Sequence, residues 1–181
     1  MDTNEDFWEL MSRERLDVDA LSPEELNKTF DFLNKRMLAV YHFVLSYNDY
    51  INTRHPYTEE KALTTLEAHL LTDICDCPNS TATRLANAWN RSLSATSQTI
   101  RKLIQKGLIT RENSKNDAKV FYLHPTEKGR SVSDAHKRYD TLDTIKTIKR
   151  LRRALSEHQI NDMFKALEAY GSLLLKKKEP K

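Results

Sequence analysis

Residues 79–111 read NSTATRLANAWNRSLSATSQTIRKLIQKGLITR, and this stretch carries the most informative pattern of the chain. Its polar start and the apolar positions that follow predict a short capped helix that extends to about Trp89. Ser94 is a good N-cap for a second helix over Ala95–Lys106, and Gly107 ends that helix as its C′ residue. The stretch therefore predicts two consecutive helices joined by a short polar turn.

The apolar pattern changes from helical to extended after these two helices. Leu108–Arg111 and Lys119–Leu123 are short β-branched or aromatic runs, and a polar stretch over 112–118 separates them. Two such runs around a polar turn predict a β-hairpin, which Pro125 closes.

Capping residues predict where the remaining helices begin. Ser22-Pro23-Glu24-Glu25 is a capping box that opens a long helix ending before Pro56. Thr64-Thr65-Leu66-Glu67 and Ser156-Glu157-His158-Gln159 are two further capping boxes, and Thr126 caps a long helix behind the hairpin. The chain is therefore predicted to be mainly α, with one small β-hairpin.

The composition excludes several classes of protein. With only 3 glycines and 5 prolines in 181 residues, the chain has no glycine-rich phosphate loop and too few turn residues for a sandwich or barrel. No apolar run is long enough to cross a membrane, the N-terminus does not resemble a secretory signal, and 2 cysteines cannot form a disulfide framework. We therefore expect a soluble, cytoplasmic protein. We also expect that it is not an enzyme, because no HExxH, GxSxG or Cys–His signature occurs.

The formal net charge of +3 conceals a segregation of charge along the chain. Residues 1–63 hold 7 basic and 13 acidic side chains, whereas residues 130–181 hold 13 basic and 7 acidic ones. Within 78–128 the count is 9 basic against 3 acidic side chains. A basic centre of this kind favours a polyanionic partner.

Taken in order, these motifs resemble the MarR family of winged helix-turn-helix transcriptional regulators over about residues 30–175. The resemblance is carried by Leu63-Thr64 with Glu67 and His69, Thr81-x-x-x-Leu85-Ala86, the run from Ser94 to Ile109, Asp117-x-Lys119, and Leu123 to Gly129. It implies that the hairpin is a wing and that terminal helices form a homodimer. It also implies a repressor that binds a pseudo-palindromic operator in double-stranded DNA and is released by a small-molecule effector.

Three features depart from the family pattern. Arg84 stands where the family usually has Glu, and the connection through Asn90-Arg91-Ser92 is about two residues longer than usual. The wing reads Asp117-Ala118-Lys119 where an Arg is usual at the last position, so the charge is kept but the bidentate fork is lost.

The resemblance also divides the chain into regions: an N-terminal arm (1–21), a helical dimerisation region (22–56 and 130–176), a winged helix-turn-helix DNA-binding lobe (57–129) and a basic tail (177–181). The long terminal helices carry apolar stripes that are too wide for one small winged domain to bury. The alternative to a dimer is an intramolecular helical bundle.

The second helix of this motif places side chains in the major groove. Helical spacing turns four residues to the core: Thr96, Ile100, Leu103 and Ile104. The opposite face carries Gln98, which can bond an adenine edge. The expected DNA contacts are Ser94, Ala95, Ser97, Gln98, Thr99, Arg101 and Lys102 on the helix, and Arg111, Lys115 and Lys119 on the wing. The alternative is an ordinary solvated helix face.

Two kinds of sensor site follow from the resemblance. Tyr47, Tyr50, His69 and Trp89 are candidates to line an effector pocket, or else are plain core residues. His69 and His136 match ligands of the zinc-sensing branch, and Asp140 stands four residues after His136 where that branch has a second His. These three side chains can hold zinc or another divalent ion as a cofactor, although a fourth ligand is missing. Otherwise the histidines are hydrogen-bonded interface residues.

Cys75 and Cys77 raise the alternative of a redox switch. With only Asp76 between them, a mutual disulfide would have an awkward geometry, and the neighbouring acids should raise the thiol pKa values. We therefore interpret them as structural thiols. A winged helix used as a protein-interaction scaffold is the remaining alternative function.

Overall fold

The computed structural model describes residues 9, 12, 17–58, 61–77, 79–113 and 120–176. Most of the predicted arm and the whole basic tail 177–181 lie outside these residues. Backbone contacts divide the chain into two compact units, with the boundary between Thr53 and Arg54, and each unit is described by itself.

The first unit consists of a short 3-10 helix, η1 (Val18–Ala20), and the long helix α2 (Pro23–Asn52). The predicted capping box is present: the amide of Glu25 donates to the hydroxyl of Ser22 at 3.3 Å, and the amide of Ser22 donates to the Glu25 carboxylate at 2.9 Å. The helix ends before Pro56, as predicted. None of its residues is buried, and apolar side chains such as Phe30 and Leu45 are exposed.

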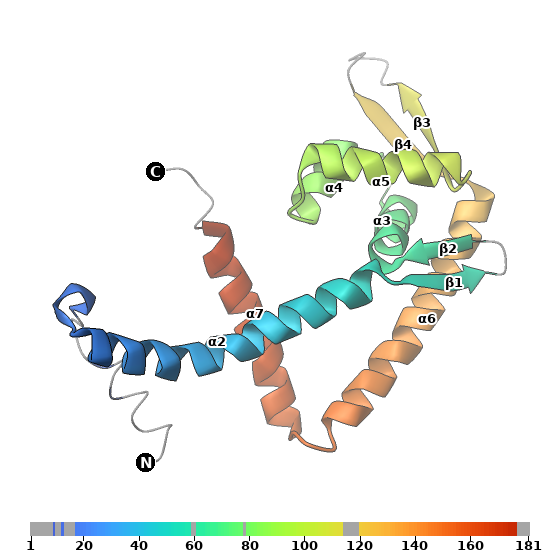
Figure 1. Cartoon of the computed structure of the whole chain (residues 1–181). Helices are drawn as coiled ribbons and strands as arrows, with labels where there is room; N and C mark the ends of the chain where they lie inside the picture. Colours follow the sequence, from blue (N-terminus) through green and yellow to red (C-terminus); the bar gives the residue numbers. More distant parts are fainter. Residues whose placement is uncertain are drawn as a thin grey trace. The chain divides into compact units, whose positions relative to one another are not determined.

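The second unit holds the remaining elements (Figure 1). Its helices are α3 (Thr65–Asp76), α4 (Ala82–Ala88), α5 (Leu93–Gln105), α6 (Glu127–Leu151) and α7 (Glu157–Lys176). Its strands are β1 (Arg54–Thr58), β2 (Lys61–Thr64), β3 (Ile109–Asn113) and β4 (Phe121–Pro125). α3 lies at the centre and packs against α6, α5 and β4. The core cluster includes Leu63, Leu70, Leu71, Ile74, Leu85, Ile100, Leu103, Leu108, Leu123 and Val132.

β1 and β2 form an antiparallel hairpin that the sequence did not predict. Arg54 pairs with Thr64 and Pro56 with Ala62, and the register is irregular between Pro56 and Thr58. Proline cannot donate to a strand ladder, so Pro56 indicates a helix stop more strongly than a strand. A two-stranded ribbon accepts it because both strands are edges.

Helix α5 begins two residues earlier than predicted. The N-cap is Ser92, whose hydroxyl accepts the amide of Ala95 at 3.2 Å, and Ser94 lies in the first helical turn. α4 causes this shift because it ends in a tight turn at Asn90, which adopts a left-handed φ of 48°. The amide of Arg91 then reaches back to the carbonyl of Ala86 at 2.9 Å, and the connection is complete by Ser92.

The end of α5 and the start of α6 are joined through one short segment. Gly107 has a left-handed φ of 69°, as its predicted C′ position requires, and the amide of Leu108 donates to the carbonyl of Leu103 at 3.0 Å. The amide of Thr126 donates to the carbonyl of Leu108 at 3.0 Å, and the hydroxyl of Thr126 caps α6 at Gly129. The hairpin between them, β3 paired with β4, confirms the predicted wing.

The last helix begins at the predicted capping box, where the amide of Gln159 donates to the hydroxyl of Ser156 at 3.2 Å. Apolar side chains are exposed along α7 and the second half of α6, among them Leu142, Phe164, Leu167 and Leu173. Across the described part of the chain, no helix combines the length and apolarity needed to cross a membrane.

Candidate nucleic-acid interface and histidine cluster

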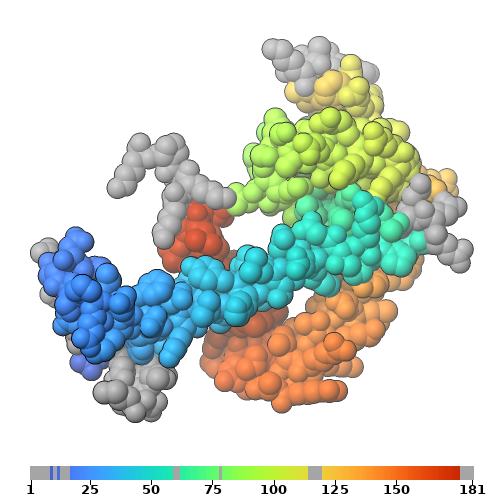
Figure 2. Space-filling view, in the orientation of Figure 1, coloured from blue at the N-terminus to red at the C-terminus, as the bar shows by residue number. Residues whose placement is uncertain are grey.

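α5 presents a polar and basic face to solvent. Ser94, Gln98, Arg101 and Lys102 are exposed, and their spacing places them on one side of the helix. The opposite side is packed, with Thr96, Ile100 and Leu103 buried as predicted. In Figure 2 the surface of α5 lies open beside that of the hairpin.

Two further predicted residues, Ala95 and Ser97, are half-buried at the margins of this face. The structure corrects the prediction for Thr99, which is only 8% exposed. Its hydroxyl donates to the carbonyl of Ala95 at 3.2 Å and accepts from Nη1 of Arg91 at 3.3 Å. Thr99 follows Thr96 by three residues and therefore shares the packed side of the helix, where it supports the turn before α5.

The wing contributes one described basic residue to this surface. Arg111 is exposed, and its Cζ lies 4.9 Å from the ring centroid of Phe121. The other predicted wing contacts, Lys115 and Lys119, lie outside the described residues. A hollow of about 620 Å³ separates the wing from α5 and the start of α4. It is lined by Thr81, Thr83, Leu93, Ser97, Ile100, Arg101, Ile104, Arg111, Val120 and Phe121, among others.

Two basic side chains, Lys106 and Arg84, contact other residues of the second unit, and the sequence did not predict these contacts. Nζ of Lys106 lies 3.1 Å from Oε2 of Glu67, and the same carboxylate caps α3 by accepting the amide of Thr64 at 3.2 Å. Arg84, the departure from the family pattern, donates to the hydroxyl of Ser80 at 3.1 Å and lies 2.9 Å from the sulfur of Cys77. The contact between Lys106 and Glu67 joins residues 39 positions apart, so no local sequence pattern could predict it.

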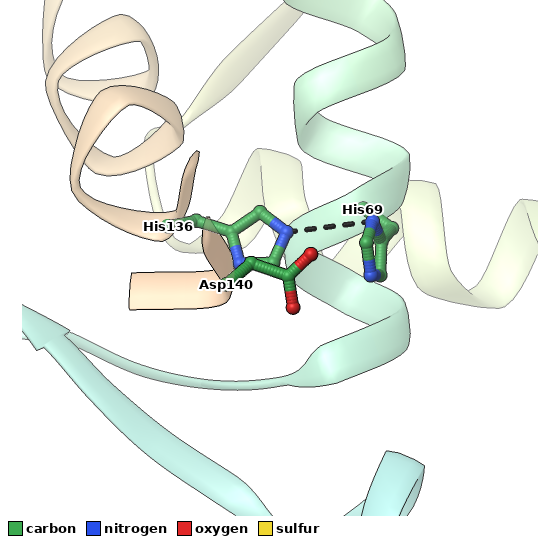
Figure 3. Close-up of side chains that lie close together, drawn as sticks. All are labelled: His69, His136 and Asp140. Atoms are coloured by element: carbon green, nitrogen blue, oxygen red, sulfur yellow. Dashed lines mark hydrogen bonds between the residues drawn. The ribbon is translucent and has the colours of Figure 1, made fainter. Parts of the chain in front are cut away.

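The three predicted metal ligands come together between α3 and α6 (Figure 3). Nε2 of His136 lies 3.4 Å from Nδ1 of His69, and the ligand atoms of His69, His136 and Asp140 all lie within 4.8 Å of one another. Tetrahedral zinc with Zn–N bonds of about 2.1 Å requires its nitrogens about 3.4 Å apart. The two ring nitrogens therefore meet this requirement, and the carboxylate must approach them by up to about 1.4 Å.

The surroundings of His136 favour its neutral imidazole. Burial, with the neighbouring His69 as a second cause, lowers the pKa of His136 to about 4. His136 is only 2% exposed, and its Nδ1 has no hydrogen-bond partner among the described residues. A neutral ring can ligate a metal ion, and the nitrogen that faces His69 is Nε2 rather than the unpartnered Nδ1. The ring of Tyr57 closes one side of the cluster at 4.9 Å from that of His136, and burial raises the phenol pKa.

The four candidate effector residues are divided between the two units, with two residues in each. On α2, the rings of Tyr47 and Tyr50 lie 5.9 Å apart, and in the second unit those of His69 and Trp89 lie 5.4 Å apart. The indole Nε1 of Trp89 donates to the carboxylate of Asp73 at 2.6 Å. Because Trp89 is the C-cap residue of α4, the histidine cluster touches the turn that leads into α5.

Both cysteines are half-buried free thiols. The pKa of Cys75 is raised, as predicted, but burial is the main cause and the charge of Asp76 contributes less. The contact between Cys77 and Arg84 is one that neighbouring residues in the sequence could not reveal.

Comparisons with known proteins agree with the fold. The model of the MarR family matches residues 63–121, and no curated protein sequence matches the chain. FabT from Streptococcus pneumoniae, solved in complex with DNA, is 24% identical with a TM-score of 0.58, over 82% of this chain and 99% of that one. The adhesin competence repressor AdcR from Streptococcus pyogenes is 22% identical with a TM-score of 0.56, over 78% and 97% of the two chains.

A third solved structure, the zinc-responsive MarR family member ZitR from Lactococcus lactis, is 19% identical with a TM-score of 0.59, over 78% of this chain and 99% of that one. At these identities the likeness establishes the fold. The MarR family model covers residues 63–121, about a third of the chain, and over the rest the likeness to solved structures shows a shared fold.

Proposed function

We propose that the protein is a dimeric, sequence-specific DNA-binding transcriptional regulator, and that it acts as a repressor. The observation that carries the proposal is the exposed face of α5, on which Ser94, Gln98, Arg101 and Lys102 are aligned beside Arg111 of the wing. FabT, which shares the fold, has been solved in complex with DNA, and this supports the same partner for this chain.

The first turns of α5 enter the major groove in this proposal. Gln98 pairs with an adenine edge, and Ser94, Ala95 and Ser97 lie close enough along the helix to meet neighbouring bases or phosphates. Arg101 and Lys102 stand further along α5 and neutralise phosphates, which makes binding strongly dependent on salt. Arg111, with Lys115 and Lys119 of the wing, contacts the adjoining backbone or minor groove.

Exposed apolar side chains support dimerisation. α2, α6 and α7 expose large apolar side chains, including Phe30, Leu142 and Phe164, and a second copy of residues 22–56 and 130–176 would bury them. A two-fold dimer presents two recognition helices to half-sites about one helical turn apart, so the operator is pseudo-palindromic.

DNA binding by fluorescence anisotropy tests the proposal, with duplexes from the region upstream of the gene. Gln98→Ala relaxes sequence preference, whereas Lys102→Ala weakens binding to all sequences alike and lowers the salt slope by about one. Arg138→Ala, which removes an exposed cation from α6, is the matched control and leaves binding unchanged. Absence of duplex binding at modest salt, with or without chelator, would refute the proposal and favour an interaction scaffold. An equal loss of specificity in both α5 variants would refute the assigned roles.

A divalent metal ion is the second candidate for control of DNA binding, and the histidine cluster supports it. His69, His136 and Asp140 would hold the ion, which would supply a positive charge that links α3 to α6. The zinc-responsive ZitR shares the fold. A small-molecule effector is the alternative signal, and its candidate residues are Tyr47 and Tyr50 in the first unit and His69 and Trp89 in the second.

Zinc titration against a chromophoric chelator distinguishes these signals. Wild-type protein competes for zinc and changes its DNA affinity when loaded, and His136→Ala and Asp140→Asn lose both responses. His158→Ala removes an exposed histidine of α7 and is the matched control. If His136→Ala binds zinc as tightly as the wild type, the cluster is not the metal site.

A further inference from the structure

The aromatic ring of Phe121 lies against the guanidinium of Arg111 on the wing. Arg111 pairs with Leu123 in the register of β3 and β4, so Phe121 is its diagonal neighbour on the same face of the ribbon. The Cζ of Arg111 lies 4.9 Å from the ring centroid, which is within the range of a cation–π contact.

This contact leaves the edge of the guanidinium available to a ligand. A guanidinium that meets a ring through its face keeps its five N–H donors in its own plane, where they match the oxygens of a phosphate. Within the described part of the chain, no hydrogen bond or ion pair occupies those donors.

The pair also faces the recognition helix. Arg111 and Phe121 line the hollow whose other side includes Ser97 and Arg101 of α5. A charge held against Phe121 therefore stands across the hollow from the residues that we assign to DNA. An arginine loses rotamer freedom when it binds a phosphate, and a stacked arginine has already lost part of that freedom.

We propose that Phe121 is a positioning residue that holds Arg111 ready for a DNA phosphate. The inference rests on the proposed function, because it deepens the role of the wing in DNA binding. It predicts that the ring contributes to affinity only through the arginine, and that an aromatic residue of another kind can replace it.

A double-mutant cycle on DNA affinity tests this inference. Phe121→Leu keeps an apolar side chain but removes the ring, and it weakens binding by about two- to five-fold. In an Arg111→Ala background the same substitution has no further effect, and Phe121→Trp retains wild-type affinity. Tyr122→Leu removes a ring from the opposite face of β4 and is the matched control, with affinity unchanged.

An equal loss from Phe121→Leu with and without Arg111 would show that the ring only supports the hairpin, and would overturn the inference. Wild-type affinity for either Phe121→Leu or Arg111→Ala would overturn it as well. If every variant has the thermal unfolding midpoint of the wild type, misfolding is excluded as the cause of a loss of DNA affinity.

A measurement without DNA separates this inference from the proposed function. The ring current of Phe121 shifts the side-chain proton resonances of Arg111 upfield in the free protein, and Phe121→Leu abolishes that shift. DNA binding without the ring-current shift overturns the inference alone. The shift in a protein that binds no duplex refutes the proposed function, and the DNA role of Arg111 with it.

Discussion

Substitution of Gly129 by alanine tests how closely α6 approaches the end of α5. Gly129 lies in the first turn of α6, and a Cβ built on it would stand 2.0 Å from the carbonyl oxygen of Leu108. That oxygen accepts the amide of Thr126 at 3.0 Å and its hydroxyl at 3.1 Å. A methyl group at Gly129 must therefore displace backbone that is held by hydrogen bonds.

The expected magnitude follows from three contributions. Alanine in place of glycine favours a helix by about 1 kcal/mol. Overpacking costs about 1–3 kcal/mol, and the loss of the two hydrogen bonds to Leu108 costs about 1 kcal/mol each. We therefore expect Gly129→Ala to lower the free energy of unfolding by about 3 kcal/mol, although the propensity change alone would raise it.

Urea unfolding followed by circular dichroism, at one protein concentration, measures this difference. Gly171→Ala is the matched control, because Gly171 lies in α7 with no atom within 4 Å of an added Cβ, and it should stabilise the protein by about 0.5–1 kcal/mol. If Gly129→Ala is as stable as the wild type with an unchanged m-value, the close approach of α6 to Leu108 is refuted.

Three further predictions concern stability. Gly107→Ala should cost about 1–2 kcal/mol in urea unfolding, since Gly107 has a left-handed φ of 69° although nothing lies within 4 Å of an added Cβ; an equal stability of both proteins contradicts this. Lys106→Met should lower stability by about 2–3 kcal/mol, because it leaves the carboxylate of Glu67, which is 5% exposed, without its cation; a loss below 1 kcal/mol would mean that water replaces the lysine. The pKa of His136 is lowered from 6.5 to about 4, so protons bind the unfolded chain more tightly. With a chelator present, stability should be constant above pH 6.5 and fall by about 3 kcal/mol towards pH 4, and a His136→Gln variant that shows the same fall would contradict this origin.

Helix boundaries were largely predictable from the sequence because capping chemistry is local. The capping boxes at Ser22, Thr64 and Ser156 and the left-handed Gly107 are all present. The start of α5 was not predictable, because Ser92 and Ser94 offer the same acceptor and the choice depends on how α4 ends.

The candidate site could be predicted only in part, because it depends on contacts between segments that are distant in the sequence. The spacing of four residues places His136 and Asp140 on one face of α6, and the resemblance adds His69, but only folding brings α3 beside α6. The burial of Thr99 and the pairing of Pro56 in a hairpin also depend on residues that are close in space, and a local sequence pattern does not reveal these residues.

The contacts of Trp89 make its intrinsic fluorescence a probe of the histidine cluster. The chain has 2 tryptophans, and Trp89 lies 5.4 Å from His69 while its indole donates to Asp73. Indole emission responds to charge in its immediate surroundings, and a proton or a metal ion at the histidine cluster supplies such a charge. In a Trp8→Phe background, emission of the unlabelled protein therefore follows events at the cluster in real time, at the residue that ends α4 and leads into α5.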